Sequence, residues 1–130
     1  MTNPSIAGKK QPINSTPYED WQKSEAIPVI KGYYIEDLKT VHLEPWLSKG
    51  GLGAFINLEG SGDANDAYLC EIPPGGSLKP QKCMFEEVIF VLKGRGATTI
   101  WSDGGHKQTF EWQVGSIFSP PLNTWRQHFN

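Results

Sequence analysis

The residues from Gly75 to Gly94 constrain the fold more than any other part of the chain, and they read G-G-S-L-K-P-Q-K-C-M-F-E-E-V-I-F-V-L-K-G. Alternate residues of an extended backbone place their side chains on one face, and four residues of one parity follow the glycine turn here: Gln81, Cys83, Phe85 and Glu87. Residues 88–92 are apolar without interruption, which predicts a strand buried on both sides. A buried polar group without a partner costs about 1–3 kcal/mol. The polar row that enters this strand is therefore the candidate site.

The rest of the chain predicts an all-β protein. Its 14 glycines and 10 prolines are scattered between short extended segments. These segments cover residues 40–46, 54–58, 67–72, 97–101, 108–112, 116–118 and 125–129, and residues 48–53 are expected to form a loop. The capping signals in Thr16-Pro17-Tyr18-Glu19 predict a short helix over residues 17–24. Short strands with almost no helix are typical of a sandwich or a barrel.

The length and charge of the chain restrict its organisation and its partners. A chain of 130 residues makes one domain, in which we expect a flexible tail over residues 1–15, a helix and strands over 16–65, and regular strands over 66–130. A net charge of −2 argues against a nucleic-acid partner or an anionic membrane surface. There is no apolar run that could span a bilayer or act as a signal peptide, so we expect a cytoplasmic protein with free thiols at Cys70 and Cys83.

Two spaced motifs resemble those of the cupin superfamily. The first motif has glycine, two histidines, glutamate and glycine at fixed spacing, and those positions are filled here by Gly75, Gln81, Cys83, Glu87 and Gly94. The second has glycine, proline, glycine, histidine and asparagine, and its positions are filled by Gly115, Pro121, Asn123, Arg126 and Asn130. The run E-E-V-I-F-V-L-K-G-R-G is also similar to the N-terminal half of longer bacterial cupin-domain proteins.

This resemblance implies a cupin-type β-barrel, also called a jelly roll or double-stranded β-helix, with residues 66–130 as its core. Residues 16–65 would cover the barrel. The chain ends on the last residue of the second motif. The resemblance therefore implies a barrel that is incomplete at the C-terminus, unless the N-terminal half or a partner subunit supplies the missing edge.

In metal-binding cupins the histidines and the glutamate hold Fe, Mn, Ni, Zn or Cu. The resemblance assigns those positions here to Gln81, Cys83, Glu87 and Arg126, and only Glu87 keeps the residue of the family. Arg126 stays protonated and cannot ligate. At about 5 Å it would repel a divalent ion by roughly 6–7 kcal/mol at an effective dielectric constant near 20. The favoured interpretation is a buried ion pair between Glu87 and Arg126, with no cofactor.

A metal site remains as the alternative interpretation. His128 has the parity of Arg126 on the last expected strand, so it could join Cys83 and Glu87, with Gln81 as a possible fourth ligand. Cysteine, histidine and carboxylate together could hold zinc and leave a position open for water. A site with neither a metal nor an ion pair is the third possibility.

The strand expected over residues 88–92 also has an outer face. Glu87, Ile89 and Val91 share the interior, whereas the residues of the other parity are also apolar: Val88, Phe90 and Leu92. Such a face needs a cover, which residues 18–58 or a second subunit would supply, and we expect a homodimer. Three remaining residues have structural roles: His42 and His106 are expected on the surface, and Cys70 as a small core residue.

Three functions are compatible with these patterns. The first is a divergent cupin that binds a small organic molecule through Gln81, Cys83, Phe85 and Arg126, and this molecule would be an anion if Arg126 is free to contact it. The second is a metal-dependent dioxygenase, isomerase or lyase that acts on a small carbonyl or carboxylate compound, with Glu87 as the catalytic residue. The third is a partial barrel that another chain completes.

Overall fold

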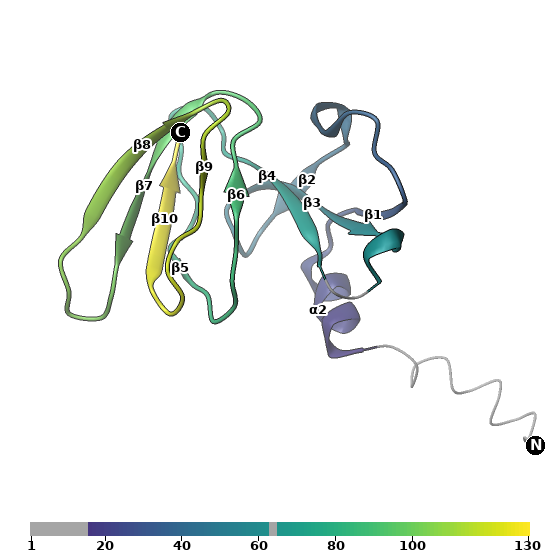
Figure 1. The fold of residues 1–130 in the computed structure, drawn as a ribbon, viewed down its shortest axis with the longest axis horizontal. Helices are drawn as coiled ribbons and strands as arrows, with labels where there is room; N and C mark the ends of the chain where they lie inside the picture. Colours follow the sequence, from purple (N-terminus) through teal and green to yellow (C-terminus); the bar gives the residue numbers. More distant parts are fainter. Residues whose placement is uncertain (1–15, 63–64) are drawn as a thin grey trace, which may run out of the picture.

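The computed structural model describes residues 16–62 and 65–130, so the tail expected over residues 1–15 lies outside the described residues. The described residues form mostly β-sheet, with a single short α-helix and no closed barrel. In the view of Figure 1 one four-stranded sheet lies at the left and another at the right, and a two-stranded sheet lies between them. None of the described helices is long and apolar enough to cross a membrane.

The N-terminal sheet is built around one long strand. It contains β1 (Val29–Gly32), β2 (Glu44–Trp46), β3 (Gly51–Leu58) and β4 (Ala67–Glu71). Strand β3 runs parallel to β1 and antiparallel to β2 and β4. Two short 3-10 helices, η2 (Leu38–Thr40) and η3 (Glu59–Ser61), flank these strands.

The loop expected over residues 48–53 is wrong for its second half, because β3 begins at Gly51. A Cβ atom at Gly53 would lie 2.2 Å from the Trp46 ring, and one at Gly51 would lie 2.3 Å from the Glu71 carbonyl oxygen. These glycines therefore allow the indole ring and a neighbouring strand to approach the backbone of β3. They serve close packing inside a strand, whereas the sequence pattern favoured a turn.

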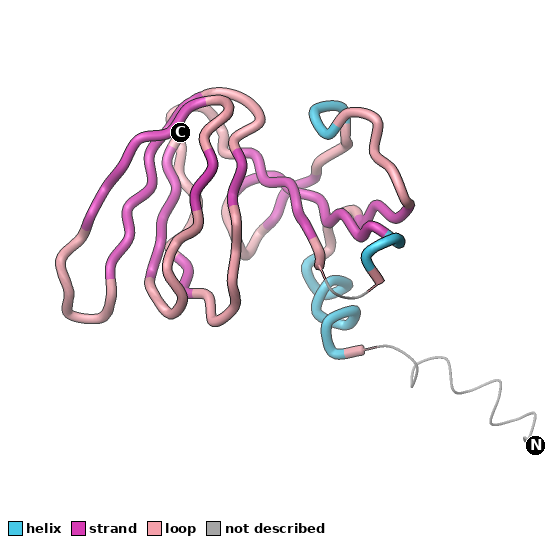
Figure 2. The backbone as a smooth tube through the Cα atoms, in the orientation of Figure 1, coloured by secondary structure: helices cyan, strands magenta, loops and turns pink. Residues whose placement is uncertain are grey.

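The C-terminal sheet contains four antiparallel strands in the order β5-β10-β7-β8. They are β5 (Gln81–Lys82), β7 (Arg95–Trp101), β8 (Gln108–Gln113) and β10 (Trp125–Phe129). Strands β7 and β8 form the expected hairpin, with Gly104 at φ 71° and a 2.8 Å bond from the Gly105 N–H to the Ser102 carbonyl. The small sheet pairs β6 (Ile89–Phe90) with β9 (Ile117–Phe118), as the tube in Figure 2 shows.

Helix α2 (Pro17–Glu25) confirms the helix expected over residues 17–24. The Thr16 hydroxyl accepts from the Glu19 N–H at 3.1 Å, and the Glu19 carboxylate accepts from the Thr16 N–H at 3.0 Å. These two bonds complete the capping box that the sequence indicates. The helix packs on the N-terminal sheet, where the rings of Trp21 and Phe55 lie edge to face at 5.2 Å.

The hydrophobic core of the N-terminal half consists of Ile27, Trp46 and Phe55, with Tyr68 and Cys70 packed against it. The Trp46 indole is 1% exposed, and its N–H donates to the Glu25 carboxylate at 2.7 Å. This contact with the core confirms the structural role expected for Cys70. His42 and His106 lie on the surface, as expected.

The strand expected over residues 88–92 is present only as the two residues of β6, and it is not buried on both sides, since Phe90 is 56% exposed. The backbone bends at Met84 and Phe85, and only two short strands, β5 and β6, lie between residues 81 and 90. The bend interrupts the alternation of side chains, so Phe85 is 63% exposed and does not share a face with Cys83 and Glu87. Val88, beyond the bend, is 68% exposed. The uniform apolar run therefore indicated an outer surface that no part of the described chain fully covers.

Candidate functional site

The residues at the two motifs meet where the last strand pairs with the first strand of the C-terminal sheet. On β10, Arg126 lies directly opposite Gln81 on β5. The segment that follows β5 carries Glu87 back to the same place, so that its carboxylate faces the guanidinium of Arg126. Three of the motif positions thus come together even though they are up to 45 residues apart, from 81 to 126.

The expected ion pair between Glu87 and Arg126 is confirmed. The Arg126 Nη1 atom donates to Glu87 Oε1 at 3.1 Å, and the two side chains are only 2% and 9% exposed. Arg126 Nη2 donates to the Pro121 carbonyl oxygen at 3.2 Å. Buried charges are stable in proteins when they are paired and hydrogen-bonded. Glu87 meets both conditions, because it is paired with Arg126 and accepts a hydrogen bond from it.

Tyr68 on β4 completes the coordination of the glutamate, because its hydroxyl donates to Glu87 Oε2. Burial raises the pKa of Tyr68 well above 10, and the negative charge of Glu87 and the bond to it raise the pKa further. The hydroxyl therefore keeps its proton and acts as a donor. Both carboxylate oxygens of Glu87 have protein partners.

Arg126 has one donor that is not used. Its Nε atom is the buried side-chain atom, among the residues that the structure describes, for which no hydrogen-bond partner is found. A buried unsatisfied polar group costs about 1–3 kcal/mol, and more when it is charged. Such groups in native structures call for an explanation, and one explanation is a ligand.

A second cation lies close to this ion pair. The Lys49 ammonium donates to Gln81 Oε1, and it lies 5.1 Å from the centre of the Trp46 ring and 4.9 Å from that of Tyr68. Contact with two aromatic faces stabilises a desolvated cation. Because Lys49 and Arg126 are opposed only by Glu87 among these contacts, the site has an excess of one positive charge.

His128 lies two residues beyond Arg126 on β10 and has different partners. Its Nδ1 atom lies 2.7 Å from the Thr98 hydroxyl, which accepts a bond from the Trp112 indole N–H at 2.9 Å. The Thr98 hydroxyl can donate to Nδ1 or accept from it, depending on which ring nitrogen carries the proton. The pKa of His128 is lowered to about 4, mainly by burial; the charges of Lys49 and Arg126 also lower it, and that of Glu87 opposes them.

The structure does not assemble the metal site that the sequence left open. Within residues 16–62 and 65–130 there is no group of three or more His, Cys, Asp or Glu side chains placed to hold a metal ion. Cys83 is buried and lies close enough to Tyr68, the partner of Glu87, to help raise its pKa, whereas the His128 ring is hydrogen-bonded to Thr98. The expected ligands Cys83, Glu87 and His128, with Gln81 as the fourth, therefore do not form a metal-binding cluster among the described residues.

Two of the site's residues were missed by the sequence analysis. Tyr68 could have been predicted, because it lies two residues before Cys70 on an expected strand and therefore faces the same side of the sheet. Lys49 could not, because it lies in a turn before β3 and reaches a residue 32 positions away. Of the residues expected in the site, Gln81, Cys83, Glu87 and Arg126 come together, and Phe85 does not.

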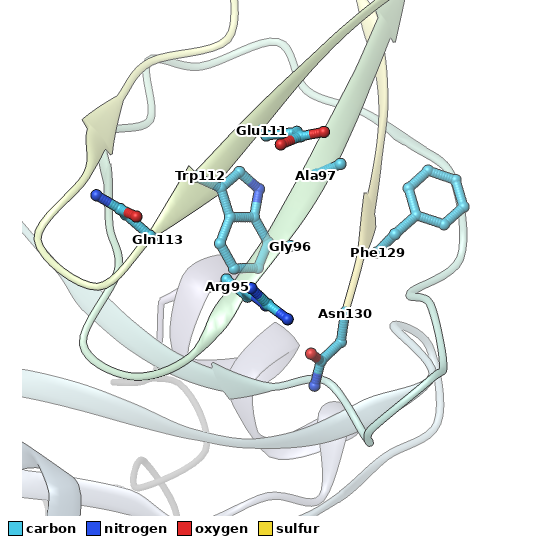
Figure 3. A pocket seen from close by; sticks show the side chains of 8 residues that line it. All are labelled: Arg95, Gly96, Ala97, Glu111, Trp112, Gln113, Phe129 and Asn130. Atoms are coloured by element: carbon cyan, nitrogen blue, oxygen red, sulfur yellow. The ribbon is translucent and has the colours of Figure 1, made fainter.

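Two cavities lie outside this cluster. One of about 540 Å³ lies between β7, β8 and the end of β10, where the Trp112 ring lies over Gly96 (Figure 3). The other, of about 480 Å³, lies between the N-terminal sheet and the outer side of β6. Neither is lined by Glu87 or Arg126. A ligand that contacts Arg126 would therefore need a local movement of the residues that bury it.

Comparison with known proteins adds nothing to this geometry. The chain matches no protein-family model, no curated protein and no solved structure.

Proposed function

We propose that this protein is a cupin-type scaffold whose interior binds a small organic carboxylate at Arg126. The observation that carries the proposal is the buried Nε atom of Arg126, which has no partner in a guanidinium that is otherwise fixed by Glu87 and Pro121. An arginine fork matches the two oxygens of a carboxylate. A ligand of this class would satisfy the donor that the protein leaves free.

The backbone at the motif positions supports the cupin-type scaffold. Gly75, Gly94 and Gly115 have φ angles of 73°, 79° and 91°, a region that favours glycine. The motif has a further glycine where this chain has Asn123, and Asn123 also adopts a positive φ of 59°. Asparagine is the residue that most readily replaces glycine in this conformation. The substitution therefore preserves the turn that precedes Arg126.

The charge of the site favours an anion over a neutral or cationic ligand. Lys49 and Arg126 face one carboxylate, that of Glu87, so a bound carboxylate would bring the cluster to neutrality. The Tyr68 hydroxyl and the Gln81 amide hold these charges in place. In this arrangement Arg126 binds the ligand, Lys49 adds attraction, and Glu87 fixes the guanidinium.

The chain offers a selective test because it contains only two arginines, Arg95 and Arg126. In a nitrogen-15 spectrum of the full chain, each arginine gives one Nε–H signal, and Arg126→Lys and Arg95→Lys assign them. The probes are acetate, malonate, succinate and benzoate. We expect one or more of them to shift the Arg126 signal to saturation and to leave the Arg95 signal in place.

The two substitutions also serve as variant and control for affinity. Arg126→Lys keeps the charge but removes the fork, so the affinity should fall roughly 10- to 100-fold, which is the loss of one charge-assisted hydrogen bond. Arg95 is exposed, and Arg95→Lys should leave the affinity unchanged. If none of the four compounds moves the Arg126 signal, the proposed function is wrong.

A second candidate is a partial barrel that another chain completes. It is favoured by the open arrangement of the strands, which form two separate four-stranded sheets and a small third one without closing into a barrel, within the described part of the chain. Urea unfolding of the purified chain tests it. A gradual, non-cooperative transition would support the candidate, and a sharp transition of the chain alone would exclude it.

A further inference from the structure

The outer side of β6 borders a groove that shares only Tyr68 with the candidate site. The groove has a volume of about 480 Å³, and we call it the outer groove. One wall consists of Val88, Phe90 and Leu92, which confirms that these residues face away from Glu87. The rest of the lining comes from Tyr33, Tyr34, Ile35 and Leu38 and from residues of β3 and β4. Residues 33–38 are thus the cover that the sequence predicted, but a partial one.

The lining of the outer groove is mostly apolar. All 12 of its residues are aliphatic or aromatic, and none carries a charge. Much of this surface is in contact with water, since Tyr33 and Tyr34 are 79% and 74% exposed, and Val88 and Phe90 are 68% and 56% exposed. A continuous exposed apolar patch of this kind marks a binding surface in soluble proteins.

The size of the exposed surface indicates what covers it. Six large apolar side chains of the groove are exposed by more than a third: Tyr33, Tyr34, Leu38, Leu58, Val88 and Phe90. At about 200 Å² for each fully exposed side chain, their exposed fractions amount to roughly 700 Å². A stable dimer buries about 800 Å² on each partner. A small molecule that fills the groove would leave the outward faces of Tyr33 and Tyr34 in water, and a second protein surface would not.

The outer groove and its exposed side chains lie on one face of the chain, so two copies of this face could contact each other. A twofold axis would place Tyr33 and Tyr34 of one copy against Val88 and Phe90 of the other, and the reverse contact follows by symmetry. None of the 12 lining residues is charged, so no lining residue brings an ion into the contact. We propose that two copies of this chain associate through their outer grooves.

The test is the mass of the full chain in solution. Light scattering after size exclusion, and sedimentation velocity from about 1 to 100 µM, should give twice the chain mass of 14.5 kDa. Val88→Asp and Tyr34→Asp place a carboxylate on the groove wall, twice in each dimer, and should raise the dissociation constant at least about 100-fold. Both residues are exposed, so the monomers should remain folded, as far-ultraviolet circular dichroism would show.

Val114→Asp is the matched control. Val114 is 60% exposed, close to the value for Val88, but it does not line the outer groove. The control should stay dimeric. A wild-type mass of 14.5 kDa at the highest concentration would overturn the proposal, and so would a Val88→Asp protein that remains dimeric.

The outcome is independent of the carboxylate site. A monomeric Val88→Asp protein should still show the shift of the Arg126 signal, because neither Glu87 nor Arg126 lines the outer groove. A monomeric wild type that binds the apolar dye anilinonaphthalene sulfonate, with loss of this binding in Val88→Asp, would mean that a small apolar ligand occupies the groove. That result would also overturn the dimer.

Discussion

The buried ion pair should be costly to break from one side. Glu87→Gln removes the carboxylate that pairs with the guanidinium of Arg126, whose side chain is 2% exposed. A buried charge that loses its partner destabilises a protein by about 3–5 kcal/mol. In Glu87→Gln the Nε atom is already without a partner, and Nη1 would retain only a neutral amide oxygen. We therefore expect a loss of stability in this range.

Removing the cation, Arg126, should lower the free energy of unfolding less than removing the anion, Glu87, because Glu87 has a second hydrogen-bond partner. In Arg126→Met, Glu87 keeps the hydroxyl of Tyr68, which can still donate to one carboxylate oxygen. The double variant Glu87→Gln with Arg126→Met has no buried charge left at this position. It should recover part of the loss, so the two single changes should not add.

Urea unfolding monitored by tryptophan fluorescence measures these differences, and the chain supplies its own control. Lys82 and Asp103 form an ion pair of similar length, 2.9 Å, in which the aspartate is 73% exposed. Lys82→Met should therefore leave the free energy of unfolding close to that of the wild type. If Glu87→Gln proves no more harmful than Lys82→Met, Glu87 and Arg126 are not a buried pair, and the account of the site is refuted.

Three further outcomes are expected. Unfolded histidine binds a proton near pH 6.5 whereas folded His128 does so only near pH 4, so acidification from pH 7 to 4 should remove about 3 kcal/mol of stability, and His128→Gln should make urea unfolding less sensitive to pH over this range. A Cβ at Gly96 would lie 2.5 Å from the Trp112 ring, whereas one at Gly60 would meet only a side chain at 3.7 Å; Gly96→Ala should lower the free energy of unfolding by about 1–3 kcal/mol, and Gly60→Ala should hardly change it. Loss of the helix cap in Thr16→Ala should cost about 1 kcal/mol in the same assay, and no change would show that the end of α2 does not contribute to stability.

Local signals in the sequence were sufficient for much of the C-terminal half. The last strand was expected at residues 125–129, and β10 has these bounds. The proline pair before this strand and the alternation of side chains within it are local signals, and they were enough to predict where the strand lies. The helix could be predicted equally well, because its capping box and its proline lie within four consecutive residues.

The errors arise where long-range packing determines the backbone. Gly51 and Gly53 were assigned to a loop, but their role is set by Trp46 and Glu71, which lie on neighbouring strands. The bend at Phe85 likewise leaves no mark in the pattern of apolar residues. Sequence periodicity reports the faces of a regular strand, and it cannot report where a strand is interrupted.

In the candidate site, too, some contacts could be predicted from the sequence and others depend on long-range packing. The pairing of Glu87 with Arg126 could be predicted, because an arginine placed beside a glutamate at a metal position needs that glutamate. Lys49 could not be predicted, because its contact with Gln81 depends on how the two sheets face each other. Without Lys49 the cluster would be neutral, and the preference for an anion would have no basis in charge.

The substitutions at the motif positions form a consistent set. Where the motif has metal-binding histidines, each polar replacement has a protein partner: Gln81 accepts from Lys49, and Arg126 donates to Glu87. His128, which could have replaced a missing ligand, is held by Thr98 and is kept neutral by burial. These partners account for the polar row without a metal ion, with one exception. That exception is the Nε atom of Arg126, and it is the atom at which a carboxylate ligand can be detected.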